Sequence, residues 1–197
     1  MAKKNEKIPT SRPALDVGAE IIGAMNEEFH NAPDRVLAVV GAAYLDSLLE
    51  ELFRAVFIGD RNEADSLLAP DRALGSNGSR YQLAYCLGLI NKEQRDDLKM
   101  IAKIRNAFAH RYDVRSFDDD EAKSLLARLH YGKELDSIVE MLVQKTTDPE
   151  QRNYLRNALS DRRKFQDTVR NLFMILLRKL NSVCRADTLT WYCANPG

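Results

Sequence analysis

The sequence predicts an all-α protein, folded as a single-domain bundle of several helices. Glycine and proline are scarce, with 9 and 6 among 197 residues. Because these residues form most tight turns, the sequence does not favour many short strands joined by such turns. Apolar residues recur every three or four positions in one segment after another, which is the spacing of one helix face. No run alternates apolar and polar residues as a half-buried strand does. We therefore expect helices throughout, packed around one core.

Two N-terminal helices follow a polar segment, residues 1–13, which we expect to form a flexible tail. The first helix should cover residues 14–30 and end before a proline. The second should cover residues 34–58 and begin at a capping Asp34, and its first half is apolar nearly all round. This predicts a long central helix buried among its neighbours. Gly41 lies in that half, where a glycine costs about 1 kcal/mol, so we expect it to let another helix approach closely.

The loosest interior segment is residues 70–79, which contain one proline and two glycines. At about ten residues it is longer than most loops between bundle helices, and such loops often carry function. A helix should follow over residues 79–90, with Cys86 as a small buried residue. Asn91 and Gln94 then have the spacing of a capping box, which opens a helix that reaches about residue 111.

Acidic residues crowd positions 118–121. Adjacent helical side chains point about 100° apart and cannot converge on one metal ion, so we interpret this run as a solvated helix start. Gly132 should end that helix, and one further helix should follow. An Asp-Pro pair at 148–149 marks the start of a long C-terminal helical region. The helical domain is thus expected to span residues 14–185, with residues 186–197 as a tail.

Composition and charge exclude several classes of protein. The formal net charge is zero, whereas a protein that coats nucleic acid is usually basic because each phosphate contact takes a lysine or an arginine. The longest purely apolar run, residues 172–177, is far shorter than the ~20 residues of a membrane span. The polar first residues do not form a secretory signal, and the three cysteines lack the spacing of a metal or redox site. We expect a cytoplasmic protein without metal or cofactor.

One polar constellation stands out late in the helix that begins near Asn91: Arg105, Asn106 and His110. An arginine can hold a phosphate and a histidine can move a proton near neutral pH, so an RNA 2′-hydroxyl can be the nucleophile without a metal. The same residues also fit a structural role. His110 would sit at a helix C-terminus, where positive charge is favourable, and Asn106 would bond to a neighbouring backbone group. The residues alone leave both interpretations open.

The C-terminal helical region is strongly basic, because residues 149–185 carry nine basic and three acidic side chains. A second helix cap is expected at Ser160. The candidates for binding a partner or nucleic acid lie along one side of this region or flank it: Arg152, Arg156, Arg162, Arg163 and Lys164. A solvated surface is the alternative. No short helix-turn-helix pattern accompanies these residues, so sequence-specific reading of a DNA groove is not supported.

Three segments of the sequence resemble the mannitol operon repressor family. They are residues 40–50 (VGAAYLDSLLE), residues 75–90 with the string RYQLAYCLGLI, and residues 104–110 (IRNAFAH). The likeness runs over residues 15–180. The resemblance implies an all-helical bacterial regulator without an evident DNA-reading module, which acts through a protein partner or through DNA contacts of an unusual kind.

The Arg-Asn-x-x-x-His string at residues 105–110 also resembles the motif of HEPN domains, which are helical bundles. Many of those are metal-independent ribonucleases that place two copies of the motif at a dimer cleft. Carried onto this chain, the resemblance implies that Arg105 holds the scissile phosphate, His110 acts as acid and base, and Asn106 orients them. The motif is short, since it covers only six residues.

Three functional hypotheses follow. The first is a non-enzymatic transcriptional regulator that works through a protein partner of unknown identity and that can itself form a homodimer. The second is a HEPN-type ribonuclease, or an inactive relative of one, that uses Arg105 and His110. The third is a repressor that binds DNA directly, and both the zero net charge and the missing groove-reading motif count against it.

Overall fold

A computed structural model describes residues 14–57, 61–157 and 160–194. These residues form helices joined by short connections, and no strand occurs among them. The all-α prediction is therefore confirmed. The chain divides into two compact units, residues 1–31 and residues 32–197, and we describe each by itself. The expected flexible tail, residues 1–13, lies outside the described residues.

The first unit contributes one described helix, α1 (Ala14–Asn31). Its end agrees with the sequence prediction to within a residue, because Pro33 disfavours helical backbone at the residue before it. His30 lies in the last turn, where the helix dipole is negative and a basic side chain is favourable.

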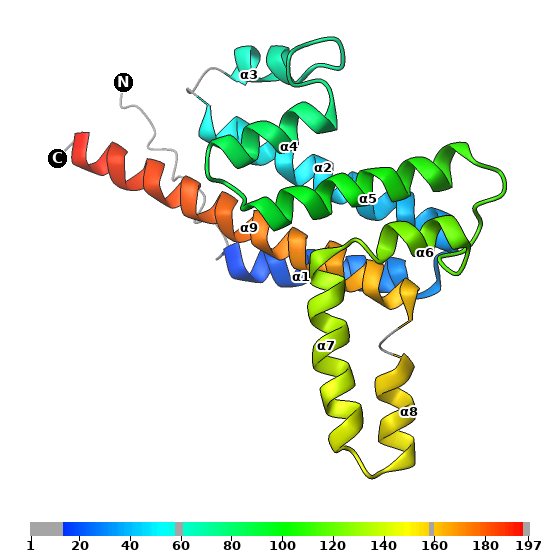
Figure 1. Cartoon of the computed structure of the whole chain (residues 1–197). Coiled ribbons are helices and arrows are strands. Elements are labelled where there is room, and N and C mark those ends of the chain that lie inside the picture. Colours follow the sequence, from blue (N-terminus) through cyan, green and yellow to red (C-terminus); the bar gives the residue numbers. More distant parts are fainter. Residues whose placement is uncertain (1–13, 58–60, 158–159, 195–197) are drawn as a thin grey trace. The chain divides into compact units, whose positions relative to one another are not determined.

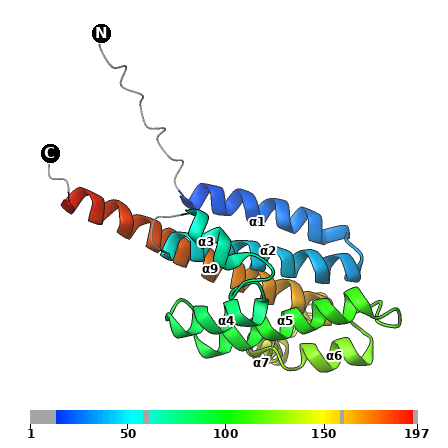
Figure 2. The same cartoon turned by 90° about the horizontal axis from the view of Figure 1, so that it is seen from above.

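The second unit is built around α2 (Asp34–Val56), which packs mainly against α9 (Asp161–Ala194) and α5 (Lys92–His110). Figure 1 shows these helices together, with two others side by side extending away from them, α7 (His130–Lys145) and α8 (Pro149–Asn157). Figure 2 shows two shorter helices along α5, α4 (Asn77–Cys86) and α6 (Asp120–Leu126). The remaining helix, α3 (Arg61–Leu68), packs against α2.

Helix α2 is the buried central helix that the sequence predicts. Its buried residues recur at helical spacing along most of its length: Leu37, Ala38, Gly41, Ala42, Leu45, Leu49, Leu52 and Phe53. A Cβ atom on Gly41 would lie 3.3 Å from Cε1 of Phe165 and 3.4 Å from Cγ2 of Val169, both on α9. The expectation that Gly41 permits a close helix approach is thus confirmed, and the approaching helix is α9.

Three phenylalanine rings join α5, the segment before α6, and α9. The ring centroids of Phe108 and Phe117 are 4.9 Å apart, and those of Phe117 and Phe165 are also 4.9 Å apart. All three side chains are fully buried. Aromatic pairs at this separation add attraction beyond the burial of their area, so the cluster fixes the segment before α6 to the core.

Asp34 does not cap α2, contrary to the sequence prediction. It is the first helical residue, and the preceding cap position is occupied by Pro33. Its carboxylate instead accepts hydrogen bonds from Phe117 N at 2.9 Å and Ser116 Oγ at 3.1 Å, and it forms an ion pair with Arg162. The donors come from distant segments, and a local capping pattern cannot reveal them. Asp34 therefore ties the segment before α6 and the start of α9 to α2.

Gly132 does not end a helix, because α6 ends at Leu126 and Gly132 lies in the first turn of α7. That turn is capped from a distance by Asp97, a buried residue of α5. Its Oδ1 accepts from the backbone N–H of His130 at 2.7 Å, and its Oδ2 accepts from that of Tyr131 at 3.2 Å. The two N–H groups are free donors at any helix start, so a carboxylate from another helix can begin α7 here.

Helix α4 is shorter than predicted. The helix expected over residues 79–90 ends at Cys86, because Gly88 takes a φ of 67°, in the left-handed region that ends helices. Cys86 is exposed, so its prediction as a buried residue was wrong. The capping box that follows is confirmed, with Asn91 and Gln94 each accepting from the backbone N–H of the other.

The acidic run at residues 118–121 forms a helix start, as predicted, since α6 begins at Asp120. Asp119 Oδ2 accepts from the backbone N–H of Arg115 at 2.7 Å and of Ser116 at 2.9 Å, and these bonds hold the pKa of Asp119 below its usual value. No group of three or more potential metal ligands comes together among the residues described.

The C-terminal helical region consists of two helices, α8 and α9, with residues 158–159 between them outside the described part. Ser160 accepts a hydrogen bond from the backbone N–H of Arg163 at 3.3 Å, which agrees with the expected second cap. Helix α9 continues past residue 185 to Ala194. None of the helices that the structure describes is long and apolar enough to span a bilayer.

A candidate pocket between α4 and α5, and the surface of α7 and α8

The loop between α3 and α4 is held in place by Arg80, which is only 6% exposed. Arg80 Nε donates to the carbonyl oxygen of Leu74 at 2.6 Å, and Nη2 donates to that of Leu68 at 2.9 Å. Nη1 forms an ion pair with Glu50 of α2 at 2.6 Å. One buried guanidinium therefore binds the last carbonyl of α3 and a carbonyl of the loop, and fastens both to the central helix. The segment that the sequence marks as loose is thus anchored.

Gly75 lets the same loop fold tightly against itself. A Cβ atom there would lie 2.2 Å from the carbonyl oxygen of Pro70 and 2.5 Å from that of Ala69, so only glycine fits. The next residue, Ser76, caps α4 by accepting from the backbone N–H of Ser79 at 3.1 Å. Helix α4 therefore begins at Asn77 instead of at Ser79, and its first turn faces α5 across a pocket.

A partly buried polar network lies on the α2 side of this first turn. Asp46 of α2 accepts from the Tyr81 hydroxyl at 2.8 Å and from the Asn77 side-chain amide at 2.6 Å. Burial raises the pKa of Asp46, and the two hydrogen bonds and the positive charge of Arg105 lower it in part. Burial, and then the negative charge of Asp46, raise the pKa of Tyr81. The network fixes the position of Tyr81 at the pocket wall.

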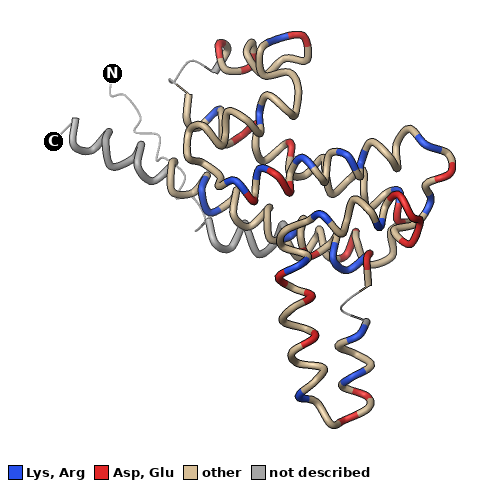
Figure 3. The backbone as a smooth tube through the Cα atoms, in the orientation of Figure 1, with Lys and Arg blue, Asp and Glu red and all other residues tan. Residues whose placement is uncertain are grey.

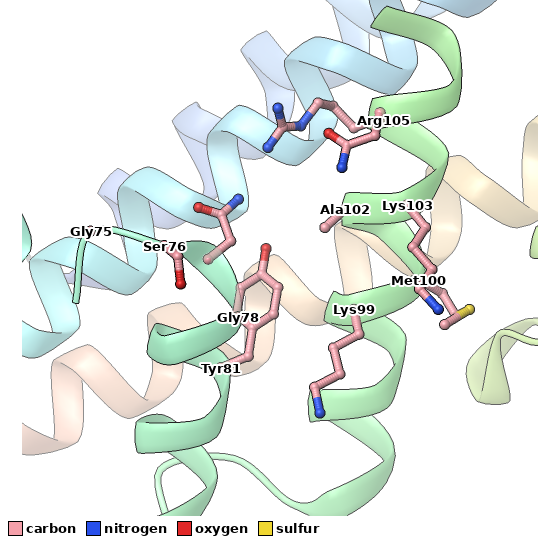
Figure 4. Close-up of a pocket in the computed structure, with 11 residues that line it drawn as sticks. Gly75, Ser76, Gly78, Tyr81, Lys99, Met100, Ala102, Lys103 and Arg105 are labelled. Carbon is pink, nitrogen blue, oxygen red and sulfur yellow. The ribbon is translucent and has the colours of Figure 1, made fainter. Parts of the chain in front are cut away.

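The pocket has a volume of about 500 Å³ and lies between the start of α4 and the middle of α5. One wall consists of residues 75–78 and Tyr81. The other wall is on α5 and includes four polar side chains: Lys99, Lys103, Arg105 and Asn106. Figure 4 shows the side chains of Tyr81 and Arg105 directed into the space between the two helices.

The structure separates the residues of the Arg-Asn-x-x-x-His string. Arg105 and Asn106 line the pocket, whereas His110 is the exposed last residue of α5 and is not part of the lining. The loop before α4 and the Arg105–Asn106 pair, which the sequence marks as separate features, meet at this pocket.

The basic candidates at the start of α9 have partners within the chain. Arg162 pairs with Asp34 of α2 and donates to the carbonyl oxygen of Ala32 at 2.7 Å. Lys164 pairs with Asp136 of α7 at 3.0 Å. These two side chains therefore hold helices together, and their charges are largely neutralised by the fold.

The other three basic candidates lie on the surface. Arg163 pairs with Asp167, one turn further along α9, at 2.9 Å. On α8, Arg152 donates to the carbonyl oxygen of Thr146 at 2.8 Å, and Arg156 is exposed. Arg152 and Arg156 lie in the pair of helices that extends away from α2, α5 and α9 (Figure 1).

Helix α7 carries an apolar face that the sequence does not reveal as exposed. Ile138 is 52% exposed, Met141 46% and Leu142 41%, and their spacing places them on one side of the helix. Tyr154 of the neighbouring α8 is also strongly exposed. Periodicity in the sequence predicts the helix, but it cannot tell which apolar side chains lack a covering element.

Comparisons with known proteins place these features in a family. The model of the family described as "Mannitol repressor" matches residues 30–182. The mannitol operon repressor of Escherichia coli K12 is 29% identical over 83 residues, which are 42% of this chain and 43% of the relative. The same protein from Escherichia coli O6:H1 matches to the same extent. The match spans less than half the length of these curated relatives.

Two solved structures share the fold. One is the MtlR-HPr complex from Escherichia coli, with a TM-score of 0.50 and 20% identity over 82% of this chain and 96% of that chain. The other is a possible transcriptional regulator, YggD, from Shigella flexneri 2a, with a TM-score of 0.51 and 14% identity over 88% of this chain and 99% of that chain. The family match covers most of the sequence, and the resemblance noted in three of its segments points the same way: the chain belongs to the mannitol repressor family.

Proposed function

We propose that this protein is a cytoplasmic, non-enzymatic transcriptional regulator that acts by binding a protein partner and not by reading DNA sequence. The observation that carries the proposal is the family match over residues 30–182, together with curated relatives that are named mannitol operon repressors. A solved relative of the same fold is in complex with HPr, so HPr is the partner that we propose for this chain. The zero net charge agrees with a protein partner better than with a long contact to DNA phosphates.

The surface that we propose for this contact lies on α7 and α8. Exposed apolar side chains that gather on one face often mark a protein interface, and Ile138, Met141 and Leu142 form such a group on α7. Arg152 and Arg156 of α8 add positive charge beside it, which suits a partner with acidic residues around an apolar anchor. Of the five basic candidates in the sequence, these two belong to the proposed surface.

Replacing Met141 with glutamate should weaken binding of Escherichia coli HPr at least about thirtyfold, because central apolar anchors contribute about 2 kcal/mol or more to an interface. Isothermal titration calorimetry with the full chain measures the affinity. Gln82→Glu is the matched control, since it adds the same charge at an exposed position of α4, away from α7 and α8, and should change the affinity little. Arg156→Glu should weaken binding mainly at low salt, because a charge at the rim of an interface is screened by ions.

Two results would count against this proposal in different ways. Failure of the wild-type chain to bind HPr would remove HPr as the partner. Binding that Met141→Glu leaves unchanged would keep the partner but place the interface elsewhere on the molecule.

A ribonuclease is the second candidate function, and one observation favours it: Arg105 and Asn106 line an open pocket that also contains two lysines. His110 does not line that pocket, so a second copy of the chain would have to supply the acid and base. We expect no cleavage when the wild-type protein is incubated with mixed single-stranded and structured RNAs in the presence of a chelator. Cleavage that is lost in a folded His110→Ala variant would establish the enzyme instead.

A further inference from the structure

The pocket between α4 and α5 contains positive charge that the fold does not neutralise by ion pairing. Lys99, Lys103 and Arg105 line it, and among the described residues none of them has a carboxylate at ion-pair distance. Arg105 interacts with the charge of Asp46, but Asp46 is only partly exposed and its oxygens accept hydrogen bonds from Tyr81 and Asn77. By contrast, Arg80 is paired with Glu50. The pocket cations are thus available to an anion from solution.

Positive charge continues on the other side of Lys99. A second pocket of about 340 Å³ shares Lys99 and Met100 with the first and is also lined by Arg128, His130 and Lys133. Arg128 and Lys133 are exposed, and the described residues place no carboxylate at ion-pair distance from either. Asp96 lines this second pocket, but it pairs with Arg95 at 2.8 Å. Lys99 therefore lines two neighbouring pockets, and both contain positively charged side chains.

The opposite wall of the first pocket adds neutral polar groups. The Tyr81 hydroxyl and the Asn77 amide N–H donate to Asp46, which leaves the Tyr81 oxygen and the Asn77 amide oxygen as acceptors for hydroxyl groups of a ligand, and Ser76 also lines this wall. Residues 77 and 78 are in the first turn of α4, where backbone N–H groups lack helical partners and carry partial positive charge. Because Arg80 and the packing around Gly75 anchor this wall, its groups are already positioned before any ligand arrives.

We propose that this pocket binds a small phosphate ester that carries hydroxyl groups, of the sugar phosphate class. Lysine and arginine side chains hold the phosphate, while the hydroxyl and amide groups of the α4 wall bind the hydroxyl-bearing part. The volume lies within the range of about 300–1,000 Å³ that is usual for small-molecule sites. Figure 3 shows that basic and acidic residues are interspersed along the helices.

This proposal goes beyond the protein contact of α7 and α8 and uses none of the side chains assigned to that surface. Glucose 6-phosphate, glucose and inorganic phosphate are titrated into the full chain in a calorimeter. Glucose 6-phosphate should bind, glucose should give no signal, and inorganic phosphate should bind at least about tenfold more weakly than the ester. Affinity for the ester should rise between pH 5 and pH 7, because a phosphate monoester loses its second proton near pH 6.

Arg105→Gln and Lys99→Gln should each weaken binding of glucose 6-phosphate about tenfold or more, since each removes a charge-assisted hydrogen bond. Lys145→Gln is the matched control, because Lys145 is an exposed lysine at the end of α7 and should leave the affinity unchanged. Equal melting temperatures show that the variants are folded. HPr binding by the Arg105→Gln and Lys99→Gln variants should be unaffected, which separates this site from the proposed interface.

Three outcomes would overturn the proposal. The first is no binding of glucose 6-phosphate, and the second is binding that the two pocket variants do not weaken. The third is a ten-nucleotide single-stranded DNA that binds more tightly than the ester and loses affinity in the Arg105 and Lys99 variants. In that case the same cations would serve a nucleic-acid site.

Discussion

Replacing Arg80 with methionine is expected to lower the free energy of unfolding by about 2–4 kcal/mol. The substitution keeps much of the side-chain volume but removes the donors for the carbonyl oxygens of Leu68 and Leu74 and the ion pair with Glu50. Because Glu50 keeps Arg54 as a second partner, most of the loss comes from the two carbonyl oxygens that are left without a donor. Urea unfolding followed by circular dichroism measures the loss.

Arg72→Met provides the matched control for Arg80→Met. Arg72 lies in the same loop, but its side chain is 62% exposed and only 3.8 Å from Asp71 in a loose surface pair. Exposed pairs contribute between zero and about 1 kcal/mol, so this variant should unfold nearly as the wild type does. If the two variants had the same stability, the loop would not depend on Arg80, and the rigidity of the pocket wall would need another cause.

Two adjacent arginines should differ sharply in their effect on stability. Arg162→Ala is expected to cost about 2–3 kcal/mol, because it leaves the partly buried carboxylate of Asp34 without its cation and the carbonyl oxygen of Ala32 without a donor. Arg163→Ala should cost under about 0.5 kcal/mol, since Arg163 is 48% exposed and pairs with Asp167 one turn away on the same helix. Thermal unfolding of both variants provides the comparison.

Arg163→Ala is the control for the change in net charge, since both variants remove one arginine from the first turn of α9. Equal melting temperatures would contradict the bridging role of Arg162. A charge reversal at Arg162 should likewise reduce stability, so any loss of partner binding in that variant must be corrected for unfolding.

Local patterns in the sequence were enough to predict the helices. The capping box at Asn91 and the close approach at Gly41 both depend on a few neighbouring residues or on the shape of one helix, and both are confirmed. Asp34 and Asp97 mark the limit of such reasoning. Their carboxylates bind backbone N–H groups that lie 83 and 33 residues further along the chain, and no local spacing encodes those partners.

For the pocket, too, the sequence predicts individual segments but not which of them come together in the fold. The sequence singled out the loop at residues 70–79 and the Arg105–Asn106 pair, but it gave no sign that the two would form opposite walls. Arg80 escaped notice because a single arginine in a helix usually faces solvent, and only the folded chain shows it 6% exposed. Which apolar residues of α7 are left uncovered is likewise decided by packing.

The cap that Asp97 supplies to α7 has a consequence for the order in which the chain folds. A helix start without capping groups is costly, and the first turn is the slow step in forming any isolated helix. Because the carboxylate that completes this turn belongs to α5, the N-terminal end of α7 gains its full stability only after α5 has formed. Helices α7 and α8 should therefore form late in folding. In a fragment that begins at residue 130, the first turn of α7 should fray, whereas in the intact protein that turn is stable.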